Sequence, residues 1–139
     1  MKAVLLVSHG SRSAKTKTDV AALVQQLKQE TGIAIFEYAF LEIEPPDISQ
    51  GLDLCISKGA SSVTVLLNFL NSGRHVDADI PEIVRQASQK YPQVKFSITS
   101  PVGQHPQIAG LFIGLIKAAV MPATTPAGRQ EAGVQNNGF

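Results

Sequence analysis

The chain contains three histidines, and each one follows an apolar run that is typical of a β-strand. They are His9, His75 and His105. Imidazole is the side chain best suited to bind a borderline transition metal or to move a proton near neutral pH. If the strands are parallel, their carboxyl ends meet at one edge of the sheet, so we expect the imidazoles to lie at that edge. This placement predicts a site for metal binding or proton transfer.

His9 and His75 are the strongest candidates for metal ligands. His9 lies in the segment Ser-His-Gly-Ser-Arg, where Gly10 permits a sharp turn that leaves the imidazole exposed. His75 follows Gly-Arg, and taken alone it is as easily a solvated loop residue as a ligand. Two neutral imidazoles with oxygen donors or water nearby form a loose site for cobalt, nickel, iron or zinc. Two or three protein ligands suit a site that must release its ion.

Other polar residues near the two histidines are candidates for supporting roles. Glu42 is a candidate proton acceptor or carboxylate ligand, although it and Glu44 also fit solvated loop charges. His105 could contact a substrate carboxylate or serve a capping role at the following helix. The arginines that flank the histidines could bind anionic groups, as could exposed helix N-termini, or could be ordinary surface residues. The residues that we assign to substrate binding are Ser11, Arg12, Gly73, Arg74 and His105.

Strand-like and helix-like segments alternate along the chain with a period of about thirty residues, the size of a βα unit. The pattern predicts strands over 3–8, 33–41, 62–70 and 94–100. It predicts helices over 13–30, 47–59 and 106–121, and a further helix for which Asp79 is the expected N-cap and Glu82 the capping-box residue. The fourth helix is expected to turn an apolar face inward.

This alternation predicts an α/β fold: a three-layer sandwich with a four-stranded, mostly parallel sheet and right-handed crossovers. We expect the flavodoxin-like strand order 2-1-3-4, which places the first and third strands side by side. Ligands bind in the crevice beyond the carboxyl ends of the strands at such a switch point, and the two loops that border it carry His9 and His75. We expect one domain over residues 1–121. The segment 122–139 lacks periodic apolar residues, so we expect a mobile tail.

Composition excludes several classes of function. A formal net charge of +1 gives no electrostatic case for nucleic acid or an anionic membrane surface. The single cysteine, Cys55, excludes an internal disulfide and a Cys-x-x-Cys site, and its apolar periodicity predicts a buried hydrophobe. The apolar run 108–121 is shorter than about 18 residues and contains Lys117, so we expect no membrane span and a cytoplasmic protein.

Five stretches of the chain resemble a known family. They are Leu-Leu-Val-Ser-His-Gly-Ser-Arg (5–12), Ala-Phe-Leu-Glu (39–42), Pro-Asp-Ile (46–48), Phe-Leu-Asn-Ser-Gly-Arg-His-Val-Asp-Ala-Asp-Ile-Pro (69–81) and Pro-Val-Gly-Gln-His-Pro (101–106). Together they resemble the CbiX-type sirohydrochlorin chelatases, the short, single-domain class II chelatases. The likeness covers about residues 1–118. His-Gly-Ser alone is a weak motif, but Gly-Arg-His and Asp-Ile-Pro at the right places make the signal specific.

The resemblance implies ATP-independent insertion of a divalent metal, cobalt first and iron or nickel as alternatives, into the tetrapyrrole sirohydrochlorin. It implies that His9 and His75 bind the metal and that Glu42 is the acidic residue after the second strand. It also implies a homodimer with the substrate in a cleft near the interface. The metal is a substrate, so no permanently bound cofactor is expected.

Three alternatives remain at the level of sequence. One is a non-catalytic carrier of metal or tetrapyrrole with the same pocket. The second is a histidine phosphatase, whose Arg-His-Gly resembles the segment here, although Ser8 stands where that enzyme needs an arginine. The third is a flavodoxin-like interaction domain without catalysis.

Overall fold

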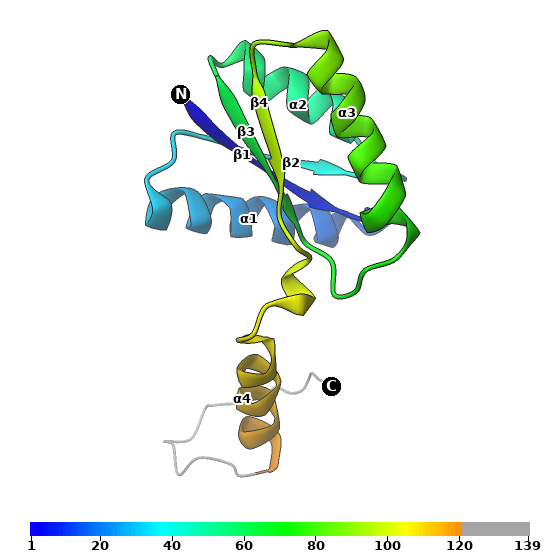
Figure 1. Ribbon diagram of the computed structural model, residues 1–139. Coiled ribbons are helices and arrows are strands. Elements are labelled where there is room, and N and C mark those ends of the chain that lie inside the picture. Colours follow the sequence, from blue (N-terminus) through cyan, green and yellow to red (C-terminus); the bar gives the residue numbers. More distant parts are fainter. Residues whose placement is uncertain (121–139) are drawn as a thin grey trace. The chain divides into compact units, whose positions relative to one another are not determined.

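A four-stranded parallel sheet forms the centre of the first part of the chain. The computed structural model describes residues 1–120, and the chain divides into two units, Met1–Gln104 and His105–Phe139. The sheet of the first unit has the order β2-β1-β3-β4, as predicted (Figure 1). Its strands are β1 (Lys2–Ser8), β2 (Ile35–Phe40), β3 (Ser62–Leu67) and β4 (Lys95–Ile98), and every neighbouring pair is parallel.

Helices cover both faces of this sheet, which confirms the three-layer α/β sandwich. They are α1 (Ala14–Thr31), α2 (Ile48–Ser57) and α3 (Ile80–Lys90). Figure 1 shows α1 along one face and α2 with α3 along the other. The buried side chains form two clusters accordingly. Val20 and Val24 of α1 pack with Leu6 on one face, whereas Leu52 and Ile80 belong to the larger cluster on the other.

The strand register brings three loops to the same edge of the sheet. Val7 lies beside Ala39 of β2 and beside Leu67 of β3, so the three strands end at nearly the same level. The chain leaves the sheet there, at residues 9, 41 and 68. β2 and β3 end earlier than the sequence predicted, at Phe40 and Leu67.

The start of α3 differs from the sequence prediction. A π-helical turn, His75–Asp79, leads directly into α3, so His75 opens a helical segment instead of ending a loop. Asp79 has helical backbone angles, φ −69° and ψ −48°, and its side chain makes no capping hydrogen bond. Asp79 thus holds the predicted position before α3, but the predicted cap and capping box were wrong: its carboxylate pairs with His75, and Glu82 pairs with Arg85.

The α2 segment follows the sequence prediction closely. Asp47 caps the helix, and its carboxylate accepts a hydrogen bond from Gln50 N, while the Gln50 side chain accepts one from Asp47 N. Cys55 of α2 is fully buried, and this burial raises the pKa of its thiol to about 12. Cys55 is therefore a packing residue, as expected.

The described part of the second unit contains one helix, α4 (Ile108–Val120). Contrary to the expected inward face, no residue of this helix is buried, and Leu111, Phe112 and Leu115 are exposed. Among the described residues, no helix is both long and apolar enough to cross a membrane. The predicted tail, 122–139, lies outside the described residues.

Candidate metal site

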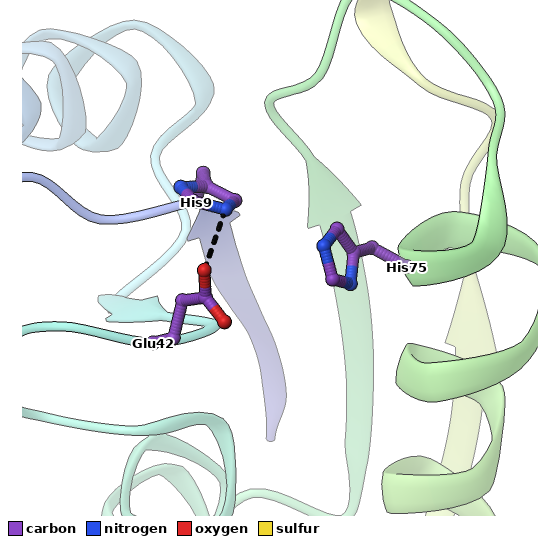
Figure 2. Close-up of side chains that lie close together, drawn as sticks. All are labelled: His9, Glu42 and His75. Atoms are coloured by element: carbon purple, nitrogen blue, oxygen red, sulfur yellow. Dashed lines mark ion pairs between the residues drawn. The ribbon is translucent and has the colours of Figure 1, made fainter.

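Three side chains that could hold a metal ion meet at the carboxyl edge of the sheet. His9, Glu42 and His75 each offer one ligand atom, and these atoms all lie within 4.8 Å of one another. The residues are distant in sequence and come from the ends of β1 and β2 and from the turn before α3 (Figure 2). The predicted convergence of the two histidines at one sheet edge is therefore observed, and Glu42 joins them.

His9 and Glu42 form the closest pair of the cluster. His9 Nε2 lies 2.9 Å from Glu42 Oε2. A dashed line marks this ion pair in Figure 2. The other ring nitrogen, Nδ1, lies 3.2 Å from the carbonyl oxygen of Gly10. A neutral imidazole carries one N–H, so it can donate to only one of these two acceptors. With the proton on Nδ1 and donated to the Gly10 carbonyl, the Nε2 lone pair is available to an ion that Glu42 would share.

Backbone hydrogen bonds join the loop after β1 to the loop after β2 and hold Glu42 beside His9. Leu41 N donates to Ser8 O over 2.8 Å, and Glu42 N donates to His9 O over 3.1 Å. Gly10 has φ +108°, and a Cβ built there would lie 2.0 Å from the carbonyl oxygen of Glu42. Only glycine permits so close an approach at such a backbone angle.

A carboxylate outside the cluster adds a further link between these loops. Ser11 N donates to Glu44 Oε2 over 2.8 Å. Glu44 is therefore a structural partner of the His9 loop and not the solvated loop charge that the sequence also allowed. This contact could not be predicted, because the 41–46 loop has no periodic pattern.

His75 faces the other two residues from a separate segment. Its ring centroid lies 5.7 Å from that of His9, with the ring planes inclined at 56°. The π-helical turn that carries it is held by Asp77 N, which donates to Gly73 O over 2.7 Å. His75 Nδ1 lies 2.9 Å from Asp79 Oδ2, so its Nε2 is the nitrogen left for the cluster.

The ends of β1 and β3 are also linked where the two histidine segments leave the sheet. Ser8 is buried, and its Oγ accepts a hydrogen bond of 3.0 Å from Asn68 Nδ2. The backbone ladder extends one step further, since Asn68 N donates to Val7 O over 2.9 Å. These bonds fix the spacing of the two strand ends that precede His9 and His75.

The cluster has the chemistry of an open, exchangeable metal site. Its side chains are about half exposed: 45% for His9, 51% for Glu42 and 46% for His75. Ligand atoms around a tetrahedral ion with bonds of about 2.0–2.1 Å lie about 3.3 Å apart, so these side chains would close by up to about 1.5 Å around an ion. Half-exposed side chains have room for this movement. Two imidazoles and one carboxylate leave positions for water or substrate.

The other predicted site residues divide into two groups. Ser11, Arg12, Gly73 and Arg74 lie in the same two loops as His9 and His75, and both arginines are exposed. Neither guanidinium makes an ion pair with another described residue. His105 belongs to the second unit, where its Nδ1 accepts a 3.0 Å hydrogen bond from Gln107 N just before α4.

Asp79 is the neighbour of the site that sequence reasoning placed in the wrong role. It lies four residues after His75, and helical i,i+4 spacing was the available signal. A capping aspartate pairs with backbone N–H groups, whereas this carboxylate pairs with an imidazole.

Taken together, the fold and the site define an α/β sandwich protein in which two histidines and one carboxylate that could hold a metal ion meet at the carboxyl edge of the sheet. A family model described as CbiX matches residues 3–119. The chain therefore belongs to the CbiX family, which confirms the resemblance seen in the five motifs.

Similar proteins include chelatases from plants and bacteria. The chain is 34% identical over 102 residues to the chloroplastic sirohydrochlorin ferrochelatase of Arabidopsis thaliana, covering 73% of this chain and 45% of that protein. It is 34% identical over 128 residues to a sirohydrochlorin cobaltochelatase of Priestia megaterium, covering 91% of this chain and 41% of that protein. The chain thus spans less than half the length of these two curated relatives.

A solved structure supports the same fold. It is the sirohydrochlorin chelatase SirB from Bacillus subtilis subspecies spizizenii in complex with cobalt. The two chains align with a TM-score of 0.77 and 30% identity, over 84% of this chain and 50% of SirB.

Proposed function

We propose that this protein inserts a divalent metal ion into sirohydrochlorin without ATP. The observation that carries the proposal is the meeting of His9, Glu42 and His75 within 4.8 Å at the carboxyl edge of the sheet. The similar proteins support the class of reaction, since they are named as sirohydrochlorin chelatases. These proteins include both ferrochelatases and cobaltochelatases. We propose cobalt as the first metal to test, followed by iron and nickel.

The reaction needs a metal donor and a proton acceptor in one place. A divalent ion in the macrocycle binds all four ring nitrogens. Two of these nitrogens carry protons beforehand, so their N–H bonds break and two protons leave. In the proposed mechanism the Nε2 atoms of His9 and His75 hold the ion at the cluster. As the ion passes to the ring nitrogens, the protons leave through Glu42 and the imidazole that the metal vacates.

The contact between His9 and Glu42 supports this division of work. At 2.9 Å, the carboxylate can exchange a proton directly with the imidazole or share the ion with it. A correctly placed general base accelerates a proton-transfer step by about 10²–10⁴-fold. The half-exposed site gives an incoming macrocycle access to the ion, and its few protein ligands favour release.

The loops around the cluster supply groups for recognising an acidic tetrapyrrole. Arg12 and Arg74 flank the two histidines, and both guanidiniums are exposed. We propose that they bind the carboxylate side chains of sirohydrochlorin, with Ser11 and Gly73 as additional substrate contacts.

We propose that two copies of the chain form the working unit. This proposal rests on the resemblance to the short, single-domain chelatases, which implies a homodimer. Sedimentation equilibrium at micromolar concentration tests this, and a mass of one chain at concentrations that support full activity contradicts it.

A metallation assay tests the proposed activity. Sirohydrochlorin is mixed with Co²⁺, Fe²⁺ or Ni²⁺ at matched free concentrations, anaerobically for iron, and the absorbance bands of the metallated ring are followed with and without protein. We expect acceleration by the wild-type protein and loss of most of it in His9→Ala, with unchanged circular dichroism. Binding of metal and tetrapyrrole with no gain over the solution rate would identify a carrier instead.

A further inference from the structure

We propose that Asp79 is a positioning residue that sets the tautomer and orientation of His75, so that Nε2 of His75 faces the metal. This inference deepens the proposed function and rests on His75 being a metal ligand. His75 Nδ1 lies 2.9 Å from Oδ2 of Asp79, a residue outside the cluster of His9, Glu42 and His75.

The geometry assigns Asp79 an indirect role. Asp79 does not belong to the group of ligand atoms that lie within 4.8 Å of one another, which consists of His9, Glu42 and His75. Its carboxylate therefore acts on an ion through His75. Metal-binding histidines commonly donate their second ring N–H to a carboxylate, which fixes the ring and raises its basicity. An ionised carboxylate only accepts hydrogen bonds, so the pairing requires the proton on Nδ1 and leaves the lone pair on Nε2.

The π-helical turn explains how the two side chains meet. Ile80 N donates to the carbonyl oxygen of His75, an i→i+5 bond that widens the turn. Such wide turns inside helices are frequent at functional sites. Ile80, the residue after the turn, is fully buried in the core. The side chains of His75 and Asp79 are 46% and 43% exposed. A half-exposed imidazole has rotational freedom unless a partner restrains it, and Asp79 is that partner.

The same turn offers a matched control. Asp77 lies two residues before Asp79, carries the same charge and is exposed, yet its carboxylate makes no hydrogen bond with a described residue. Asp77→Asn and Asp79→Asn therefore change the net charge of the same turn equally. Only Asp79→Asn changes the group that faces His75.

The experiment reads the tautomer and the metal affinity of the full chain. Long-range ¹H–¹⁵N NMR of the imidazoles at pH 8, assigned with His75→Ala, reports which nitrogen of His75 carries the proton. We expect Nδ1–H in the wild type and in Asp77→Asn, and a shift toward Nε2–H, which free histidine prefers in water, in Asp79→Asn. Calorimetric titration with Co²⁺ should show affinity lower by about 10–100-fold in Asp79→Asn and within about twofold of wild type in Asp77→Asn.

The outcomes separate this inference from the proposed function. Wild-type tautomer and Co²⁺ affinity in Asp79→Asn, together with loss of affinity in His75→Ala, would overturn the role of Asp79 and leave the proposed function standing. The expected losses in a protein that does not accelerate metallation would support the role of Asp79 and reject the chelatase reaction. Equal losses in both asparagine variants would also overturn the inference, because they would reflect charge alone.

Discussion

Substitution of Gly10 by alanine tests whether the close approach of the β1 and β2 loops builds the metal site. The added Cβ would lie 2.0 Å from the carbonyl oxygen of Glu42, so the two atoms must separate by more than about 1 Å to reach ordinary contact. The backbone angle φ +108° adds conformational strain of about 1–3 kcal/mol for a residue with a side chain. Overpacking adds about 1–3 kcal/mol if the loops stay in place.

These terms predict a loss of about 2–6 kcal/mol in the free energy of unfolding of Gly10→Ala if the loops hold their positions. If the 41–44 loop moves instead, part of this loss is relieved and the 2.9 Å contact between His9 and Glu42 opens. Metal affinity then falls. Urea denaturation and Co²⁺ titration of the same preparation measure both effects.

Two other glycines separate the sources of the effect. Gly32 ends α1 with φ +72° and has nothing within 4 Å of a built Cβ, so Gly32→Ala should show the conformational strain alone. Gly73 has neither a positive φ nor a neighbour within 4 Å, so Gly73→Ala should be nearly neutral. The expected order of destabilisation is Gly73→Ala, Gly32→Ala, Gly10→Ala. Wild-type stability together with wild-type metal affinity in Gly10→Ala would refute the reasoning.

Three further predictions concern individual side chains. Glu42→Gln keeps the shape of the side chain but removes its charge, so the rate of metallation should fall by about 10²-fold or more while the fold is retained; an unchanged turnover number would exclude proton acceptance by Glu42. Arg12→Ala should raise KM for sirohydrochlorin more than it lowers kcat, and an unaltered KM would remove Arg12 from substrate binding. Cys55 should resist thiol reagents at pH 8 until the protein unfolds, because burial raises the pKa of its thiol to about 12; rapid labelling of the native protein would contradict that burial.

Much of the fold could be predicted because its signals are local and periodic. Alternating apolar runs and amphipathic helices predict a parallel α/β sheet, and the strand order follows from few topological alternatives. The register then brings His9 and His75 together, since Val7 and Leu67 are neighbours at the strand ends. Convergence of the two histidines needed no knowledge of side-chain packing.

The finer structure of the site depends on contacts between loops that periodicity does not encode. The bond from Ser11 N to Glu44 joins residues 33 positions apart within irregular backbone. Asp79 was assigned to a cap because an aspartate before an apolar run and Pro81 is typical of a helix N-terminus. The π-helical turn moved the start of the helical segment back to His75 and gave the carboxylate a different partner.

The apolar pattern of α4 shows a different limit. Spacing predicted which residues share a helix face, and the helix is present over Ile108–Val120. Whether such a face is buried depends on what packs against it, which spacing does not encode. Leu111 and Leu115 are 63% and 60% exposed.

The most direct test of the central claim is a double-mutant cycle for Co²⁺ affinity with His9→Ala, His75→Ala and the double variant. Because the two rings lie 5.7 Å apart and their ligand atoms belong to one cluster, the histidines should share a single ion. Each single variant should then lose most of the Co²⁺ binding free energy. The two substitutions should show a coupling energy of about 0.5–3 kcal/mol. Losses that add to within about 0.5 kcal/mol, or wild-type affinity in either single variant, would contradict a shared ion.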